Sequence, residues 1–384
     1  HHAEAIAKKM EELDFFASIK RMDYDEAVEK GLITVMGAET DEKFLSNVMG
    51  QVNDKAAVEK VADTFKMVYT PFHGTGHKLI PEALKRLGVK HVICVPEQMV
   101  IDGDFPTVIS PNPENPEGFY LAVDLAKKEG ADFILGSDPD ADRVGIMVRT
   151  SDGEFKVLTG NQTGVLLLDY LIGAKQRTGK MPANPVALKT IVTTEMARKV
   201  AETNGLKSYD TFTGFKFLAE KKDKLENAGE GKVIFAYEES YGYMLGDYVR
   251  DKDAVTAALS LTEMAAWYAG QGMTLYDALL ACYETDLWRM SHQLKNTAGY
   301  LPVERKLAIK LGKLAQEFGC PSPQGTALSF PLTITQMADF VGVPRETASR
   351  ACKRLGELGL GRDENRRFVI PDGERLALYC RSGQ

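Results

Sequence analysis

The sequence predicts an α/β protein with two consecutive mixed or parallel sheets, followed by a smaller α+β domain. Short apolar runs alternate with amphipathic runs of about 10 to 15 residues over the first 284 residues, which is typical of largely parallel sheets. The net charge then changes sign, from −12 over residues 1–285 to +5 over residues 286–384. We therefore expect an acidic, enzyme-like part and a basic part that tolerates nucleic acid.

The composition is that of a globular protein. The chain has 384 residues, 44% hydrophobic and 26% charged, which leaves room for two or three domains. No apolar run reaches the roughly 18 residues of a membrane helix, and no signal pattern opens the chain, so a cytoplasmic protein without a membrane partner is expected. The cysteines lack zinc-site spacing, which favours free thiols; they are Cys94, Cys282, Cys320, Cys352 and Cys380.

The first 90 residues predict a helical start and then a strand, a turn and a helix. Apolar residues at helical spacing predict a helix from 4 to 16, and amphipathic helices continue to about residue 65. A strand at 65–70, a glycine turn and a helix at 79–87 form a weak candidate anion site. We expect His73, in this turn, to hydrogen-bond the turn rather than to act as a base.

Three carboxylates stand at alternate positions in the segment 136–143, directly behind the apolar run 133–135; they are Asp138, Asp140 and Asp142. Alternate residues of a tight loop can converge on one hard cation. Oxygen ligands at the carboxyl end of a strand suit Mg²⁺ and phosphate chemistry. An acidic surface turn is the alternative, but Arg143 beside the acids and the apolar strand resumed at 144–148 favour the metal site.

A second α/β unit begins near Leu158, with a helix at 161–171 and a strand at 186–192. The loops that follow carry polar groups suited to a phosphorylated sugar. Glu238 and Ser240 suit sugar hydroxyls, and the cations suited to a phosphate are Lys216, Arg250 and Lys252. Taken singly, each of these residues is more simply explained as an ordinary surface residue.

The order of six loops changes that interpretation. They are TPFHGTG at 70–76, SPNPENPEG at 110–118, GSDPDADRVG at 136–145, TFTGFKF at 211–217, EESYG at 238–242 and RDKDAV at 250–255. In this order and at these spacings they resemble the α-D-phosphohexomutase superfamily, and within it the bacterial phosphoglucomutases, over about residues 1–284. The resemblance implies transfer of a phosphoryl group between O1 and O6 of a hexose phosphate, with glucose phosphate the expected partner.

The resemblance also implies site residues. Mg²⁺, the expected cofactor, would be held by Asp138, Asp140 and Asp142, with support from Arg143. Hexose hydroxyls would be contacted by Glu238 and Ser240. The sugar orientation would be selected by Gly214, Phe215 and Lys216. The basic groups near the substrate would be Arg250 and Lys252.

Two further parts of the superfamily pattern are not among these 384 residues. A phosphoserine loop would precede residue 1, and a fourth domain with an Arg-x-Ser-Gly-Thr type phosphate loop would follow the helix predicted at 275–283. No catalytic residue is therefore assigned beyond the support expected from Arg143.

The C-terminal part predicts a winged helix-turn-helix. Leucines at helical spacing predict a helix at 303–318. A capped helix at 332–341, a turn at 342–344 and a basic helix at 345–358 have helix-turn-helix order. The segment 360–371 is expected to form a β-hairpin wing that bears Arg362, Arg366 and Arg367.

Two segments, 335–339 and 345–350, resemble the C-terminal domain of the cyclic-AMP receptor and fumarate-nitrate regulator family. Double-stranded DNA is then an expected partner, and a protein-binding winged helix is the alternative. The resemblance places at base edges Arg345, Glu346 and Arg350. Phosphate contacts are expected from Ser349 and Lys353. Specific DNA binding would need a homodimer, because such domains read two half-sites roughly 34 to 36 Å apart.

Five segments are expected: a helical tail of a first mutase domain at 1–43, a domain at 44–155 that contains the metal loop (136–145), a domain at 156–284 that contains the sugar loop (238–242), a junction at 285–302 and the winged helix at 303–384. Three hypotheses remain open. The chain is a mutase core that is inactive or needs complementation, a transcription regulator that senses a sugar phosphate, or a chimera of two unrelated coding fragments. The chimera is favoured because neither part keeps its complete functional set.

We expect negligible mutase turnover from these 384 residues alone, since neither the phosphoryl donor nor the fourth-domain phosphate loop is among them. A coupled assay that follows the conversion of glucose 1-phosphate to glucose 6-phosphate measures this. Turnover at an ordinary rate would contradict the expectation.

Overall fold

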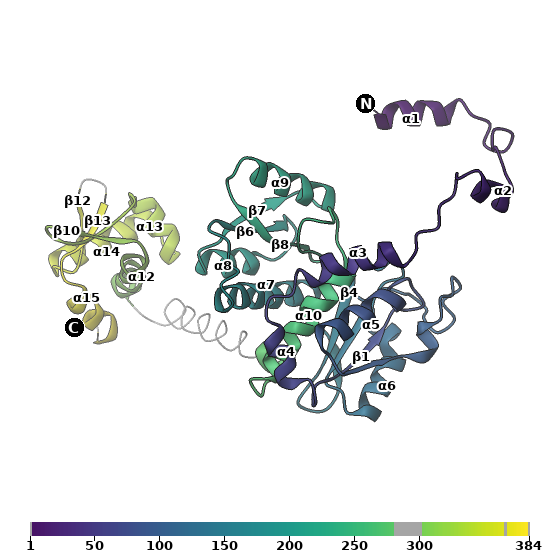
Figure 1. The fold of residues 1–384 in the computed structure, drawn as a ribbon. Helices are drawn as coiled ribbons and strands as arrows, with labels where there is room; N and C mark the ends of the chain where they lie inside the picture. The colour runs from purple at the N-terminus through teal and green to yellow at the C-terminus, as the bar shows by residue number, and fades with distance from the viewer. Residues whose placement is uncertain (1, 280–301, 365–366, 383–384) are drawn as a thin grey trace. The chain divides into compact units, whose positions relative to one another are not determined.

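A computed structural model describes residues 2–279, 302–364 and 367–382, and the chain forms two compact units, His1–Leu279 and Leu280–Gln384 (Figure 1). Four predictions lie wholly or largely outside the described residues: the junction at 285–302, the end of the helix predicted at 275–283, Cys282 and Arg366. The other four cysteines are free thiols, as predicted.

Four helices precede the first sheet: α1 His2–Glu11, α2 Tyr24–Glu29, α3 Ala38–Met49 and α4 Lys55–Val61. The first helix is shorter than predicted, because the Asp14 carboxylate accepts the backbone N–H groups of Phe16 and Ala17 and closes a turn. The side chains of α1 are exposed along its whole length. The helices α3 and α4, by contrast, bury apolar residues in the core of the unit.

The first sheet has the strand order β2-β1-β3-β4-β5. Its strands are β1 Lys66–Thr70, β2 His91–Cys94, β3 Phe133–Ser137, β4 Val144–Arg149 and β5 Phe155–Val157. Strand β1 pairs in parallel with β2 and β3, whereas β4 runs antiparallel to β3 and β5. The sheet is therefore mixed, and the strands predicted at 65–70 and 133–135 lie side by side at its centre.

Alternate residues of this sheet face two helical layers. Met67 and Leu135 join the cluster that contains α5, while Val68 and Ile134 join the cluster that contains α6. This produces an α/β/α arrangement in which the carboxyl ends of β1 and β3 open at one edge. The helices and 3₁₀ turns around the sheet are α5 Gly76–Leu87, α6 Tyr120–Glu129, η1 Pro96–Met99 and η2 Pro116–Phe119.

The second sheet has the strand order β7-β6-β8-β9. Its strands are β6 Pro185–Thr190, β7 Lys207–Thr211, β8 Lys232–Glu238 and β9 Gly242–Met244. Strand β6 pairs in parallel with β7 and β8, and β9 runs antiparallel to β8. One face packs against α7 and α8, and the other packs against α9. These helices are α7 Gly160–Arg177, α8 Glu195–Thr203 and α9 Phe215–Asn227.

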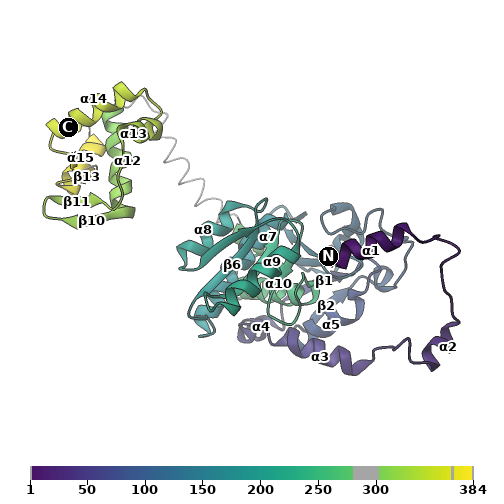
Figure 2. The ribbon, with the colours of Figure 1, turned by 90° about the horizontal axis from the view of Figure 1, so that it is seen from above.

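One helix joins the two sheets. In α10, Ala254–Ala269, every residue from Ala254 to Ala266 is buried. It packs against α3, α4 and α5 on the side of the first sheet, and against α7 and β9 on the side of the second (Figure 2). A single hydrophobic cluster consequently contains residues of both sheets.

The second unit is a winged helix-turn-helix. Its elements are α12 Val303–Phe318, β10 Gly319–Ser322, β11 Gly325–Leu328, α13 Ile334–Val341, α14 Arg345–Glu357, β12 Arg362–Glu364, β13 Arg367–Ile370 and α15 Gly373–Ser382. Gly342 adopts the left-handed conformation (φ 69°) that ends α13 and begins the turn. The predicted helices and wing are confirmed, and with them the α/β and α+β fold classes.

The hairpin of β10 and β11 and the helix α15 are not among the predicted elements. The sequence Gly319-Cys320-Pro321 predicts the end of a helix rather than a strand, because proline has no backbone N–H to donate to either structure. In the structure β10 is the edge strand of the order β10-β11-β13-β12, where a strand needs partners on one side only.

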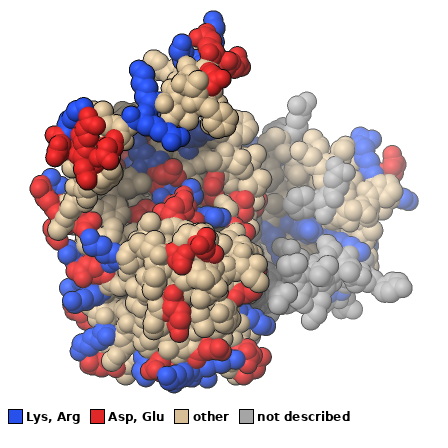
Figure 3. Space-filling view, turned by 90° about the vertical axis from the view of Figure 1, so that its right-hand side faces the viewer, with Lys and Arg blue, Asp and Glu red and all other residues tan. Residues whose placement is uncertain are grey.

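The surface of the chain carries both signs of charge. Figure 3 shows acidic and basic side chains interspersed over the face that it presents. Among the described residues, no helix is both long enough and apolar enough to span a membrane.

Gly164→Ala should lower the free energy of unfolding of the first unit by about 1 to 3 kcal/mol, because a Cβ at this position would lie 2.0 Å from the Tyr237 ring. That ring is buried in a cluster with the rings of Phe235 and Tyr243 and has little room to move. Urea denaturation followed by circular dichroism measures the change. Gly103→Ala is the matched control, since a Cβ there meets no atom within 4 Å; an equal effect of both substitutions would contradict the packing argument.

Candidate functional site

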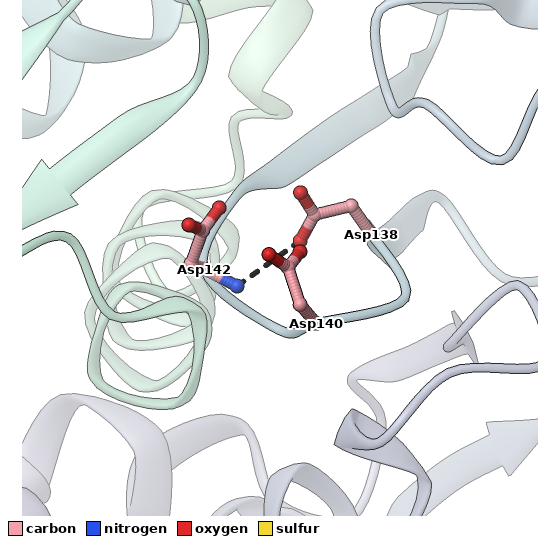
Figure 4. A group of neighbouring side chains, drawn as sticks. All are labelled: Asp138, Asp140 and Asp142. Carbon is pink, nitrogen blue, oxygen red and sulfur yellow. Dashed lines mark hydrogen bonds between the residues drawn. The ribbon is translucent and has the colours of Figure 1, made fainter. Parts of the chain in front are cut away.

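Three carboxylates converge at the carboxyl end of β3. One ligand oxygen each from Asp138, Asp140 and Asp142 lies within 4.8 Å of the others (Figure 4). Asp138 is buried and Asp140 is exposed, so the cluster extends from the core to the surface. Its donors are hard oxygens of the kind that Mg²⁺ and Ca²⁺ take as ligands.

The loop geometry brings these side chains together. Oδ1 of Asp138 accepts the backbone N–H groups of Asp142 (3.0 Å) and Arg143 (2.9 Å), and Nε of Arg143 donates to Oδ2 at 2.8 Å. Ala141 takes a positive φ of 56°, which turns the chain back on itself. Burial raises the pKa of Asp138 to about 6, and the charges of Asp140 and Asp142 add to this rise, while the hydrogen bonds from Arg143 oppose it.

The metal loop rests on the strand-turn-helix at residues 70–76. A Cβ on Gly74 would lie 2.3 Å from the Pro139 Cα, so only glycine allows this approach. The backbone N–H of Thr75 donates to the Pro139 carbonyl at 2.8 Å. The candidate anion turn therefore supports the metal loop.

The His73 side chain forms hydrogen bonds, as expected, but to the loop at 100–107 rather than to its own turn. Its imidazole is buried, with Nδ1 2.8 Å from the Val100 carbonyl oxygen and Nε2 2.8 Å from Oγ1 of Thr107. Both ring nitrogens are thus engaged in holding the loop between η1 and η2.

The sugar loop adjoins the metal loop through backbone contacts. Arg143 and Gly242 form an isolated antiparallel bridge, and the N–H of Val144 donates to the Tyr241 carbonyl at 3.2 Å. Glu238, at the end of β8, accepts the N–H of Gly214 at 2.5 Å. One carboxylate oxygen of Glu238 is therefore engaged in fixing the 211–217 loop.

Lys252 links the sugar side of the site to the metal loop. Its ammonium lies 2.7 Å from Oδ2 of Asp142 and 5.6 Å from the centroid of the Phe215 ring. Partial burial alone would lower the pKa of Lys252, but the hydrogen bond and the charge of Asp142 raise it. The ammonium is thus held in its charged form beside the acids.

Three predicted substrate residues remain: Arg250, Lys216 and Ser240. Arg250 is exposed and pairs with Asp223 at 3.1 Å. Nζ of Lys216 lies 4.9 Å from the centroid of the Phe217 ring. Ser240 is half-buried in the sugar loop, two residues after Glu238.

Two residues at the site were not predicted. Glu114, from the proline-rich loop, lies 3.7 Å from Nη1 of Arg143. Asp253 caps α10 by accepting the N–H groups of Val255 and Thr256, and the N–H of Ala254 donates to the Ala141 carbonyl of the metal loop at 3.1 Å. An aspartate directly before an apolar helix is a recognisable cap signal; the role of Glu114 has no such local signal.

In the second unit, five predicted DNA-contacting residues share one exposed face of α14: Arg345, Glu346, Ser349, Arg350 and Lys353. The opposite face buries Ala348, Ala351 and Leu355 against the core of the unit. Helical periodicity explains this separation, since residues three and four apart lie on the same side.

Comparisons with known proteins match both units. Residues 42–153 match the model of phosphoglucomutase/phosphomannomutase alpha/beta/alpha domain II, residues 159–285 match that of domain III, and residues 305–379 match that of the Crp-like helix-turn-helix domain.

The first unit also has curated relatives and a similar solved structure. Phosphoglucomutase of Staphylococcus aureus strain N315 is 37% identical over 243 residues, which are 62% of this chain and 43% of that protein. The protein of strain USA300 is 37% identical over 220 residues, 57% of this chain and 39% of that protein. A crystal structure from Thermus thermophilus, titled as a phosphomannomutase, aligns with a TM-score of 0.50 and 21% identity over 63% of this chain and 49% of that one.

The chain thus spans less than half the length of the curated relatives that it matches. The first sheet overlaps the segment matched by the domain II model, the second sheet lies in the segment matched by the domain III model, and the helix-turn-helix lies in the segment matched by the third model. The chain therefore joins domains II and III of the phosphoglucomutase/phosphomannomutase family to a Crp-like helix-turn-helix domain, as the order of its motifs predicted.

Proposed function

We propose that the first unit binds Mg²⁺ and a hexose phosphate, with glucose phosphate as the preferred sugar. The observation that carries this proposal is the convergence of three carboxylates within 4.8 Å beside Lys252. Mg²⁺ prefers such oxygens and usually completes its shell with substrate phosphate or water. The relatives named above are phosphoglucomutases, which act on sugar phosphates by their name.

The proposed roles follow the position of each group. Asp138, Asp140 and Asp142 hold the metal, which would neutralise charge on the phosphate oxygens. Arg143 keeps Asp138 oriented through its 2.8 Å hydrogen bond. The sugar hydroxyls are read by Glu238 and Ser240. The sugar is oriented by Gly214, Phe215 and Lys216, and the phosphate is attracted by Arg250 and Lys252.

Asp140→Asn should weaken Mg²⁺ binding by about 10- to 100-fold, since one full negative charge is removed from the site. Isothermal titration of the 384-residue chain with MgCl₂ measures the affinity. Asp132→Asn is the matched control, because Asp132 precedes the opposite end of β3 and pairs with the exposed Arg149. Equal Mg²⁺ affinity of the two variants would contradict the metal site.

We further propose that the second unit binds double-stranded DNA as a homodimer. The observation in favour is the exposed face of α14, which presents two arginines, a lysine, a glutamate and a serine together. Arg345, Glu346 and Arg350 would read base edges, and Ser349 and Lys353 would contact phosphates.

Arg350→Ala should weaken binding to a duplex selected by the wild-type chain from a random pool, by about 1 to 3 kcal/mol. Fluorescence anisotropy measures the affinity at fixed salt. The control is Lys313→Ala, because Lys313 is an exposed cation on α12, outside the helix-turn-helix. Absence of any selected duplex, or equal losses in the two variants, would count against the proposal.

A regulator that senses a sugar phosphate differs from a chimera in one respect: in the regulator, sugar phosphate bound to the first unit changes the DNA affinity of the second. Each unit has its own hydrophobic core, which favours independent folding. For a chimera, glucose 6-phosphate should leave the DNA affinity unchanged and the units should melt separately. A change in DNA affinity with the sugar phosphate would instead favour a regulator that senses it.

A further inference from the structure

The loop between β9 and α10, residues 245–253, carries the two cations that the proposed function assigns to the phosphate, Arg250 and Lys252. Gly246, near the start of this loop, has a positive φ of 80°. Arg250 is exposed at the surface of this loop. Such a loop presents its charges in one place only if other residues anchor it.

An ion-pair network provides that anchor. The ammonium of Lys222 donates to Glu226 at 2.7 Å and to Asp247 of the loop, and its side chain is only 8% exposed. Lys232, at the start of β8, pairs with the same two acids. Two cations and two anions thus balance, and the two acids offset the cost of burying the Lys222 side chain.

The network connects the loop to the other side of the site. Lys222 lies on α9, two turns after Phe215, and Gly214 directly before that helix donates to Glu238. The Phe215 ring in turn lies 5.6 Å from the Lys252 ammonium. The Lys222–Asp247 contact is therefore one of the ion pairs that fix the distance between the sugar-orienting loop and the basic loop, together with Lys232–Asp247 and the pair of Arg250 with Asp223 of α9.

Packing of α9 against the second sheet does not require the Lys222–Asp247 contact. Glu226 already pairs with Lys222 and accepts the N–H of Val233 at 3.0 Å, which joins α9 to β8 without Asp247. The Asp247 side chain is half-exposed and buries little apolar surface. The pair with Asp247 thus acts on the loop rather than on the core.

We propose that Lys222 is a positioning residue that holds the 245–253 loop, through Asp247, where Arg250 and Lys252 can meet a sugar phosphate. The inference rests on the proposed function for its ligand. It assigns no contact between Lys222 and the sugar phosphate.

The test uses the 384-residue chain and the variants Lys222→Met and Asp247→Asn. Lys224→Met is the matched control, because Lys224 lies on the same helix and pairs with Glu220 at the exposed surface. Titration with glucose 6-phosphate in saturating Mg²⁺ measures affinity, and amide hydrogen exchange measures the opening of residues 245–253. We expect about tenfold weaker binding and faster exchange in this loop alone for the first two variants, with neither change in the control.

The binding and exchange measurements distinguish a failure of the proposed function from a failure of the inference about Lys222. If the wild-type chain binds no glucose 6-phosphate, the proposed function is wrong, and exchange of the loop still decides whether Lys222 positions it. Unchanged exchange of residues 245–253 in Lys222→Met would overturn the inference. So would exchange that rises throughout the first unit, since this indicates a purely structural role. If Lys222→Met does not fold, Asp247→Asn carries the test, because asparagine keeps the volume and an acceptor oxygen.

Discussion

The burial of α10 is the constraint on which the first unit depends. A helix that is apolar on all sides has to be enclosed, and two sheets that share one hydrophobic cluster enclose it. Its one acid, Glu263, accepts the hydroxyl of Tyr170 at 2.7 Å and the N–H of Asn53 at 2.9 Å. Burial raises the pKa of Glu263, and these two hydrogen bonds oppose the rise. Because the metal loop bonds to the first turn of α10, the core also sets the position of the site.

Much of the architecture could be predicted from local patterns. Apolar runs located the strands at 66–70 and 133–137, and Thr333 with Gln336 forms the capping box that begins α13. Three aspartates at alternate positions predicted the cluster at the end of β3. These features depend on residues close together in the sequence, so periodicity and spacing are sufficient to find them.

The remainder depends on pairs far apart in the chain. Lys252 meets Asp142, and Glu114 meets Arg143, only because the sheets bring their loops together. Arg250, predicted beside Lys252 for the substrate, pairs with Asp223 at the surface. The assignment of each residue to the site stays a prediction, because the order of motifs does not show which partner a long side chain contacts.

The bridge between Arg143 and Gly242 has a consequence for how such a site can change. It is made by backbone atoms, so this contact between the metal loop and the sugar loop uses no side-chain atom. Under the proposed function, Ser240 can then be exchanged to suit a different pattern of hydroxyl groups while the aspartates keep their places, whereas Glu238 also holds the 211–217 loop through Gly214. The proposed sugar selectivity can thus change separately from the proposed metal site, which the main-chain bridge helps to hold.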